Sequence, residues 1–489
     1  MDVDGIAKAS GSGDLFLAGE WRAAADGRTY GVTDPATGAV IREVSAAGPR
    51  DSAEAVDVAA EALDGWRTTS RRRRSEILHD MHAAMRDHAD ALARLITLEN
   101  GKAYRDAKAE VFYAAEFFRW FAEEAVRIGS SFGDAPAGGF RHLVRKQAVG
   151  VTAFVTPWNF PAAMATRKIA PALAAGCTVI LKPAPDTPLT ALAVAGLLKE
   201  VGLPDGVCSV LPTDRAAEVA DVWFRDDRVR KFSFTGSTAT GRILLRQAAE
   251  HVVNVTMELG GNAPFIVCPD ADIDSAVRGA MDAKMRGGGE VCIAANRFYV
   301  HEDVADEFTA KFGAAMASVR IGPGLAEGTE LGPMINEAAV AKIWGLVDDA
   351  ITKGAKVAAQ GPTPDGPGWY FPATVLTDVP EDAELLRTEV FGPVAPILTY
   401  RDENEMLKRA NDAEHGLASY VYSGSLERAL RIGDRLDAGM VGLNRGLISD
   451  PAAPFGGVKQ SGLGREGGRE GIDAFLETKY IAVDWPNIP

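Results

Sequence analysis

From residue 149 onward, short apolar runs typical of strands alternate with longer stretches typical of helices. The expected strands cover residues 149–155, 178–181, 207–211, 229–234, 252–257 and 264–267, and helix-compatible stretches cover 167–175 and 189–200. Such alternation predicts a parallel sheet with helices on its faces. A second series of the same kind runs from residue 295 to 445. The pattern therefore predicts an α/β fold with two domains that join near Glu258.

The part of the chain before this alternation has a different pattern. Residues 15–45 predict short strands with turns, and residues 51–126 predict helices, the first capped by Asp51 or Ser52. Residues 127–147 are rich in Gly, Pro and Ser, which predicts a hairpin that leaves the body of its domain. Because an exposed strand edge invites pairing with another chain, this hairpin and a C-terminal strand at 479–483 predict an oligomer.

Charge and cysteine usage exclude several classes of protein. A net charge of −15 argues against binding to nucleic acid, and the basic run 71–74 precedes a helical pattern, so we expect a solvated helix start. No apolar window is long enough to span a membrane, and Met1-Asp2-Val3-Asp4 does not resemble a secretory signal. The four cysteines are too scattered for a disulfide framework or a metal site, which favours a reducing cytoplasm.

Three motifs follow predicted strands, at the sheet edge where parallel sheets bind ligands. In the segment 156–161, Asn159 could donate a hydrogen bond to an oxyanion, although Pro and Asn also build ordinary turns. Lys182 could reach a ribose or a phosphate, although a single lysine is usually just solvated. Gly236 and Ser237 precede a helical stretch, which suits either a phosphate or simple helix capping.

Two further residues have the chemistry of a nucleophile and a base. Glu258 ends an apolar strand before two glycines, so desolvation should raise its pKa, unless it is a structural carboxylate bonded to loop amides. Cys292 follows three glycines, whose free N–H groups could stabilise a thiolate and an oxyanion, although single cysteines are more often small buried residues. No histidine joins these motifs, so a cysteine protease would lack its base. With Asn159, the set meets the needs of aldehyde oxidation through a thiohemiacetal.

Taken together, these motifs resemble the aldehyde dehydrogenase superfamily over nearly the whole chain. The matching stretches are 156–161, 181–183, 234–241, 258–264, 296–297, 389–393 and 454–464. The closer resemblance is to succinate-semialdehyde dehydrogenases, through residues 163–168, Ser449 before 454–457, and 462–467.

The resemblance implies a Rossmann-type cofactor domain, an α/β catalytic domain and a small β oligomerisation element. The cofactor domain would comprise residues 1–126 and 148–257, and the catalytic domain 258–445. Residues 127–147 and 470–489 would form the oligomerisation element of a homodimer or homotetramer.

The resemblance also implies a role for each matching residue. Cys292 would be the nucleophile and Glu258 the base for deacylation, while Asn159 and the Cys292 amide would form the oxyanion hole. For NAD or NADP, Lys182 would hold the adenosine ribose, Gly236 and Ser237 the pyrophosphate, and Glu389 the nicotinamide ribose. Further cofactor contacts are expected from Thr156, Pro157, Trp158, Ala184, Pro185, Leu259 and Phe391.

Arg167, Arg286 and Ser449, with Phe455, match positions that bind the distal carboxylate of the substrate. Two arginines can hold a carboxylate by charge-assisted bonds, although arginines are more often simply exposed. They predict NAD(P)-dependent oxidation of a short carboxylate-bearing aldehyde, first succinic semialdehyde to succinate and next glutaric semialdehyde. A phosphorylated aldehyde, another semialdehyde and a catalytically impaired structural homologue are the alternatives. A CoA-acylating enzyme fits less well, because such relatives lack the residue that matches Glu258.

Five positions depart from the pattern of the family. Gly287 and Glu290 stand where Asn and Gln are usual, and Glu290 should raise the Cys292 pKa unless it is paired or turned away. Ala294 replaces a second cysteine that some relatives carry, which excludes a disulfide with Cys292. Arg445 would bring a third positive charge close to Ser449. Pro185 replaces a glutamate of NAD-specific relatives, so we expect NADP to be accepted.

Overall fold

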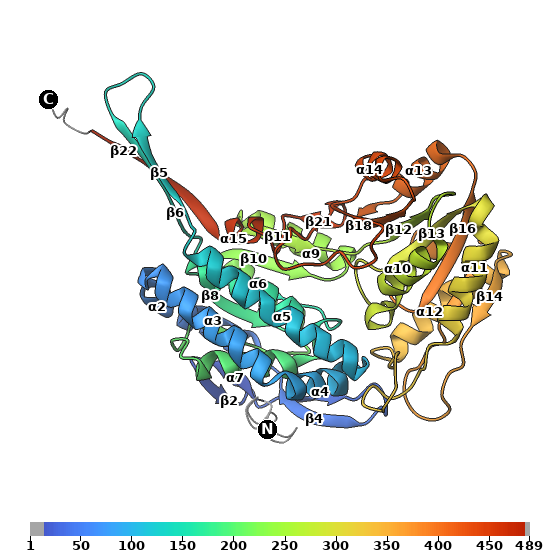
Figure 1. The fold of residues 1–489 in the computed structure, drawn as a ribbon. Coiled ribbons are helices and arrows are strands. Elements are labelled where there is room, and N and C mark those ends of the chain that lie inside the picture. Colours follow the sequence, from blue (N-terminus) through green and yellow to red (C-terminus); the bar gives the residue numbers. More distant parts are fainter. Residues whose placement is uncertain (1–13, 485–489) are drawn as a thin grey trace.

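The computed structural model describes residues 14–484, so the expectation for Met1–Asp4 and the predicted outer domain limits at 1 and 489 lie outside the described residues. Figure 1 shows two α/β bodies side by side, with a narrow β-ribbon that projects from the first. The α/β fold predicted from the sequence is confirmed. In the described part of the chain, no helix is both long enough and apolar enough to span a membrane.

The first sheet has eight strands, and its central strands are parallel and buried. In spatial order the strands are β2 (Glu20–Arg22), β1 (Leu15–Leu17), β9 (Cys208–Val210), β8 (Thr178–Lys182), β7 (Val151–Val155), β10 (Val229–Thr235), β11 (Asn254–Glu258) and β21 (Gly462–Leu463). Successive side chains of a strand point to opposite faces, so Ala153 and Phe154 belong to separate apolar clusters. Both faces are therefore covered, as the apolar runs predicted.

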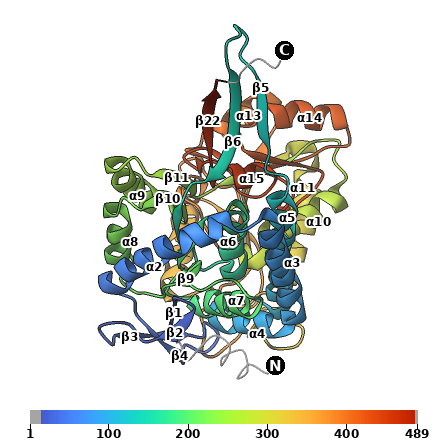
Figure 2. The same cartoon turned by 90° about the vertical axis from the view of Figure 1, so that its left-hand side faces the viewer.

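Helices of the first domain cover these two faces. They are α2 (Pro49–Thr68), α3 (Arg71–Asp87), α4 (Ala89–Asn100), α5 (Tyr104–Ala125), α6 (Pro161–Ala175), α7 (Pro188–Glu200), α8 (Ala216–Arg225) and α9 (Thr238–Glu250). The buried apolar residues of α3 to α7, with Trp66 of α2, pack on one face of the sheet, and those of α8 and α9, with the rest of α2, pack on the other. Figure 2 shows α2 running across the front of this domain.

Three local predictions in this domain need correction. Helix α6 begins at Pro161, well before residue 167, because proline is tolerated in the first helical turn. The cap of α2 is Gly48, whose N–H donates to the Asp51 carboxylate at 2.9 Å, so Asp51 acts from inside the first turn. Arg74 is buried and donates to the carbonyl of Ala174 at 3.1 Å, so the basic run is only partly solvated.

The second sheet has seven strands, all parallel to their neighbours except β14. They are β14 (Lys356–Gln360), β15 (Thr374–Thr377), β16 (Val394–Tyr400), β13 (Ala295–His301), β12 (Ala263–Val267), β18 (Ala418–Tyr422) and β19 (Met440–Leu443). Their helices are α10 (Ile273–Met285), α11 (Glu302–Ala317), α12 (Glu337–Thr352), α13 (Glu403–Asn411) and α14 (Leu426–Asp434). The sequence placed β12 in the first series of strands, but it pairs with β13 and β18 in the second sheet.

The projecting ribbon is a three-stranded antiparallel sheet (Figures 1 and 2). It combines the hairpin β5 (Ser130–Asp134) and β6 (Arg141–Ala148) with the C-terminal strand β22 (Leu476–Val483). The hairpin and the C-terminal strand expected from the sequence are both present, and β22 begins three residues before the predicted position 479. The role of this ribbon in oligomerisation stays a prediction.

The segment after β19 returns from the second domain to the first. It contributes β20 (Val458–Lys459), which pairs with β17 (His415–Gly416), and then β21, which pairs with β11. Short α15 (Glu470–Asp473) leads into β22. The remaining short elements are β3 (Thr29–Thr33), β4 (Val40–Ser45), η1 (Arg286–Gly289) and η2 (Glu384–Leu386). This return places Gly462 opposite Glu258, at the carboxyl end of β11.

Candidate active site

Two cavities meet at Cys292. The larger has a volume of about 400 Å³ and is lined by Pro157, Trp158, Asn159, Met164, Thr235, Gly236, Ser237, Glu258, Leu259, Gly260, Cys292, Ile335, Asn336, Ala338, Ala339, Lys342, Glu389, Val390 and Phe391. The smaller is lined by Tyr113, Asn159, Phe160, Met164, Arg167, Arg286, Val291, Cys292, Ile293, Ser449 and Phe455. Since Cys292 and Asn159 line both, a ligand in either cavity lies next to this pair.

The backbone before Cys292 adopts left-handed conformations that favour glycine. Gly287, Gly288 and Gly289 all have positive φ angles, of 53°, 67° and 80°. A Cβ on Gly289 would lie 2.4 Å from the Gly392 carbonyl oxygen, so no side chain fits there. A Cβ on Gly287 would meet nothing closer than 3.5 Å. Asparagine tolerates the left-handed region, so the departure at Gly287 preserves the conformation of the loop.

The Cys292 sulfur lies in an environment that favours the protonated thiol. Burial, and after it the charge of Glu389, raises its pKa to about 12, while the guanidinium of Arg167 opposes this shift. The sequence suggested that loop amides would stabilise a thiolate, but desolvation outweighs them here. The loop itself is well held, because Tyr420 donates from its hydroxyl to the Ile293 carbonyl at 2.7 Å.

Glu258 is the last residue of β11, opposite Thr235 on one side and Gly462 on the other. Its side chain is buried, and neither carboxyl oxygen has a hydrogen-bond partner among the described residues. Burial and then the nearby charge of Glu466 hold its pKa well above the ordinary value. Gly456 leaves room for it, since a Cβ there would lie 2.9 Å from Glu258 Oε1. The group is desolvated as predicted, and it is not bonded to loop amides.

Asn159 precedes α6 and is held from both domains. Its Nδ2 donates to the carbonyl of Glu290 at 2.8 Å, and its Oδ1 accepts from the Phe160 amide at 3.1 Å. Its own carbonyl accepts from Lys102 Nζ at 2.5 Å. The sequence analysis missed Lys102, which stands in an ordinary loop between α4 and α5 and has no motif around it.

The carboxyl group of Glu290 is turned away from the nucleophile. Its Oε1 accepts from the amide of Ile335 at 3.2 Å, and burial raises its pKa to about 8. The charged groups that shift the Cys292 pKa most are Glu389, Arg167 and Glu258. Glu290 is therefore turned away, as the sequence analysis required if it was not to raise the Cys292 pKa. Having glutamate here instead of the usual glutamine brings no negative charge next to the sulfur.

Seven of the predicted cofactor residues line the larger cavity: Pro157, Trp158, Gly236, Ser237, Leu259, Glu389 and Phe391. Ser237 caps α9 by accepting from the Thr240 amide at 3.3 Å. Burial raises the pKa of Glu389 to about 7, and its Oε1 accepts from the Gly261 amide at 3.3 Å. Phe391 has a φ of 55°, which is rare for a residue with a side chain.

Four predicted cofactor residues, Thr156, Lys182, Ala184 and Pro185, do not line this cavity. Thr156 follows β7, Lys182 ends the neighbouring strand β8, and Ala184 and Pro185 come after it. The Thr156 amide donates to the Lys182 carbonyl at 3.2 Å. Lys182 is buried, which lowers its pKa to about 8, and the charge of Asp186 opposes that shift.

The second domain contributes lining residues that the sequence analysis missed. Several belong to α12 and the loop before it: Ile335, Asn336, Ala338, Ala339 and Lys342. Lys342 Nζ donates to the carbonyl of Glu389 at 2.7 Å. Nothing in this amphipathic helix distinguishes it in the sequence from an ordinary surface helix.

The smaller cavity brings together Arg167, Arg286 and Ser449, as the sequence predicted. Arg167 is buried and donates from Nη2 to the Tyr113 hydroxyl at 2.6 Å. Its Nε and Nη1 make no hydrogen bond within the described chain, although Nη1 lies 3.7 Å from Glu466 Oε2. Arg167 therefore has an anionic neighbour, because it shares the Glu466 carboxylate with Lys168.

Arg286 lies between two aromatic rings, 5.4 Å from the centroid of Tyr113 and 5.2 Å from that of Phe160. Among the residues described, it has no ion-pair or hydrogen-bond partner. Arg445 is exposed, bonds to the Leu447 carbonyl and does not line the cavity, so the predicted third positive charge is absent from it.

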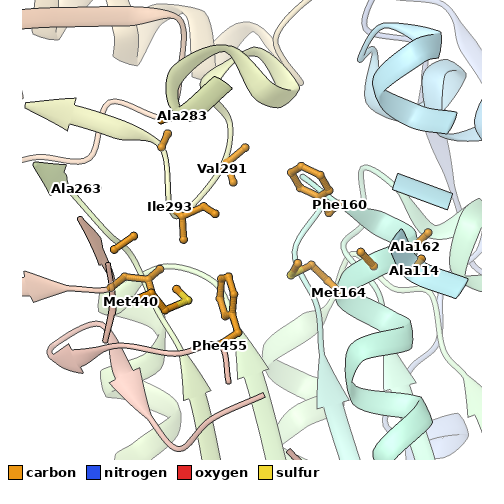
Figure 3. Packing of buried hydrophobic residues seen from close by; sticks show 14 of the residues in the cluster. Ala114, Phe160, Ala162, Met164, Ala263, Ala283, Val291, Ile293, Met440 and Phe455 are labelled. Carbon is orange, nitrogen blue, oxygen red and sulfur yellow. The ribbon is translucent and has the colours of Figure 1, made fainter. Parts of the chain in front are cut away.

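Apolar side chains form the rest of this cavity. Figure 3 shows Val291 and Ile293, on either side of Cys292 in the chain, facing Phe160, Met164 and Phe455 across a shared space. The Phe455 ring also lies 4.0 Å from the Arg167 guanidinium carbon. The cavity thus offers an apolar wall beside the sulfur and two cationic groups.

The sequence and the fold of this chain are similar to those of known proteins. Residues 21–481 match the model of the Aldehyde dehydrogenase family. A glutarate-semialdehyde dehydrogenase of Pseudomonas putida is 48% identical over 471 residues, covering 96% of this chain and 97% of its own. The NADP(+) succinate-semialdehyde dehydrogenase of Escherichia coli is 47% identical with the same coverage. A crystal structure of an NADP-dependent enzyme of E. coli superposes with a TM-score of 0.95 at 46% identity, covering 96% of this chain and 98% of that one.

Proposed function

The chain belongs to the aldehyde dehydrogenase family, and on that premise we propose that it oxidises a short aldehyde bearing a carboxylate at its far end. Succinic semialdehyde is the first candidate and glutaric semialdehyde the second. The observation that carries this proposal is the buried guanidinium of Arg167. Its Nε and Nη1 have no hydrogen-bond partner among the described residues, and the guanidinium lines the cavity that also holds Cys292 and Arg286. Unpaired buried donors are costly, so a carboxylate that accepts from them is favoured.

In the proposed reaction, the Cys292 thiol releases its proton to solvent water and the sulfur attacks the aldehyde carbon, forming a thiohemiacetal. Asn159 has two amide protons, of which one is used by the Glu290 carbonyl, so the other is available to the oxyanion. When NAD(P)⁺ is bound, its nicotinamide would accept the hydride of the thiohemiacetal carbon, which would leave a thioester on Cys292. Glu258 then takes a proton from water, which attacks the thioester and releases the acid and the free thiol.

The residues of the larger cavity fit such a cofactor. The N-terminus of α9 opens onto it through Ser237, and helix N-termini suit phosphate groups. A Cβ on Gly236 would lie 2.4 Å from the ring of Phe234, so the backbone there stays free of side chain. We assign Gly236 and Ser237 to the pyrophosphate, Glu389 to the nicotinamide ribose and Lys182 to the adenosine ribose.

Both forms of the cofactor fit this proposal. Pro185 is exposed in the turn after β8, and it offers no side-chain group to a ribose hydroxyl. It therefore adds no charge that would repel a 2′-phosphate, which supports use of NADP⁺ beside NAD⁺.

We also propose that the enzyme is a homodimer or homotetramer. The ribbon of β5, β6 and β22 projects from the body (Figure 1), and β22 and β5 are its outer strands in the described part of the chain. Outer strands of a sheet pair readily with a second copy. A molecular mass of a monomer by light scattering, at micromolar concentration, would contradict this assignment.

A panel of aldehydes tests the proposed function. Reduced nicotinamide formation, followed by absorbance, would be measured with succinic semialdehyde, glutaric semialdehyde, butanal and a phosphorylated short aldehyde. We expect kcat/KM to be highest for one of the two semialdehydes. A preference for butanal would refute the carboxylate assignment, and a preference for the phosphorylated aldehyde would replace it.

A further inference from the structure

The Tyr113 hydroxyl joins two of the residues assigned to the substrate carboxylate. Tyr113 lies on α5 and accepts from Arg167 Nη2 at 2.6 Å, and the same hydroxyl is hydrogen-bonded to Ser449 Oγ. We propose that Tyr113 is a positioning residue that determines specificity for acidic aldehydes, by directing the Ser449 proton and the Arg167 guanidinium toward the ligand. This inference rests on the proposed function and adds a residue that the sequence motifs do not contain.

The direction of the hydrogen bonds follows from what each group can donate. An arginine can only donate, so the Tyr113 oxygen must accept from Arg167. If Ser449 also donated to Tyr113, the phenolic proton would have no acceptor among the described residues. The arrangement that satisfies every proton has Tyr113 donating to Ser449. The Ser449 hydroxyl proton is then free to face the cavity, where it can donate to a carboxylate oxygen.

Tyr113 also limits where Arg167 can point. With Nη2 bound to the hydroxyl and Nη1 near Glu466, the guanidinium plane has little rotational freedom. Its Nε and Nη1 donors are the ones without hydrogen-bond partners. A ligand carboxylate would therefore meet an arginine that is already oriented, which lowers the entropic cost of binding.

The aromatic ring of Tyr113 has a separate role in packing. It lies 5.4 Å from the Arg286 guanidinium carbon and 5.0 Å, edge to face, from the ring of Phe117. Tyr113→Phe keeps these contacts and removes only the hydroxyl. The variant therefore separates the hydrogen-bonding role from the packing role.

The test compares Tyr113→Phe, Ser449→Ala and the double variant with the wild type, using succinic semialdehyde and butanal. We expect Tyr113→Phe to lower kcat/KM for succinic semialdehyde about tenfold, mainly through KM, and to leave butanal within about twofold. The effect of the double variant should be smaller than the product of the two single effects, because the hydroxyls act as one chain. Tyr104→Phe is the matched control, since that tyrosine is on the same helix and its hydroxyl bonds to Asp90.

Each other outcome refutes the inference. Equal losses for both aldehydes would mean a structural role, and unchanged kinetics or fully independent effects of the two variants would mean that Tyr113 does not direct Ser449. Thermal unfolding identifies a variant that fails to fold. If Tyr113→Phe fails to fold, Ser449→Ala is compared with the wild type instead. Equal losses for both aldehydes in Ser449→Ala would then also refute the inference. A wild type that does not prefer succinic semialdehyde would refute the proposed function itself, which this panel reveals separately.

Discussion

Asn159 Nδ2 donates to the carbonyl oxygen of Glu290 at 2.8 Å. This bond connects the loop after β7 in the first domain with the cysteine loop in the second. Asn159 and Cys292 are therefore held at a defined relative position before any ligand binds. The Glu290 carbonyl oxygen thus points toward Asn159, while the Glu290 carboxyl group accepts a hydrogen bond from the Ile335 amide.

The first prediction concerns the reactivity of the thiol. Because burial raises the Cys292 pKa to about 12, the thiolate fraction should be small at neutral pH without cofactor. The rate of alkylation by iodoacetamide should rise about tenfold per pH unit between about pH 7 and pH 9. Glu290→Gln should leave this profile unchanged, because its carboxyl group points away from the sulfur. A plateau below about pH 8 in the wild type would contradict the burial argument.

The second prediction separates the two chemical steps. Cys292→Ala should abolish turnover, since no thiohemiacetal can form. Glu258→Gln should keep a rapid burst of reduced nicotinamide of up to one equivalent per active site, with steady-state turnover slowed at least about a hundredfold. Stopped-flow absorbance resolves the two phases. Full steady-state turnover by Glu258→Gln would show that another group activates the water.

The third prediction concerns the substrate carboxylate. Arg286 has no ion-pair partner in the described chain, so no acidic side chain loses its partner in Arg286→Ala. Loss of one charge-assisted bond, roughly 1.5–3 kcal/mol, should lower kcat/KM for succinic semialdehyde about ten- to a hundredfold. Butanal should be affected far less.

Arg167→Ala should show the same discrimination between the aldehydes, but it also removes a partner of Glu466 and should lower thermal stability. Arg445→Ala is the control, because Arg445 is exposed and outside the cavity. Equal losses for both aldehydes in Arg286→Ala would locate the carboxylate elsewhere.

The fourth prediction concerns cofactor choice. Activity with NADP⁺ should be detectable, because Pro185 offers no carboxylate. Asp186 follows it, and its charge acts on Lys182. Asp186→Asn should therefore raise the ratio of kcat/KM for NADP⁺ to that for NAD⁺ about three- to tenfold, by removing a negative charge near the expected 2′-phosphate. Glu200→Gln, at the far end of α7, should leave the ratio unchanged. Absence of any activity with saturating NADP⁺ would refute the prediction.

The positions of residues at or just after strand ends could be predicted from the sequence. Glu258 terminates an apolar run, and Asn159 and Ser237 follow two others, so the carboxyl ends of one parallel sheet bring them to the same edge. The glycines before Cys292 were expected to offer free N–H groups, whereas the structure shows that the backbone at Gly289 excludes a side chain. Strand and helix periodicity is local, which is why short windows of sequence carry it.

Contacts between distant segments were not predictable in the same way. Tyr113 and Ser449 are 336 positions apart, and Lys102 and Asn159 are 57 apart, yet both pairs are hydrogen-bonded. No periodicity links such positions, because the return of the chain after β19 and the packing of α5 on α6 bring them together. The same holds for α12, whose residues line the cofactor side of the site without any motif.

The sequence by itself determined the order of strands and helices, the edge of the sheet that carries the chemistry, and the types of residue available there. Only the tertiary structure decided how those residues are charged and paired. Burial favours the protonated thiol of Cys292 where loop amides suggested a thiolate, and the Ile335 amide holds the Glu290 carboxyl group away from the sulfur. The physical reason is that backbone pattern depends on near neighbours, whereas desolvation and hydrogen-bond direction depend on every element that packs around a group.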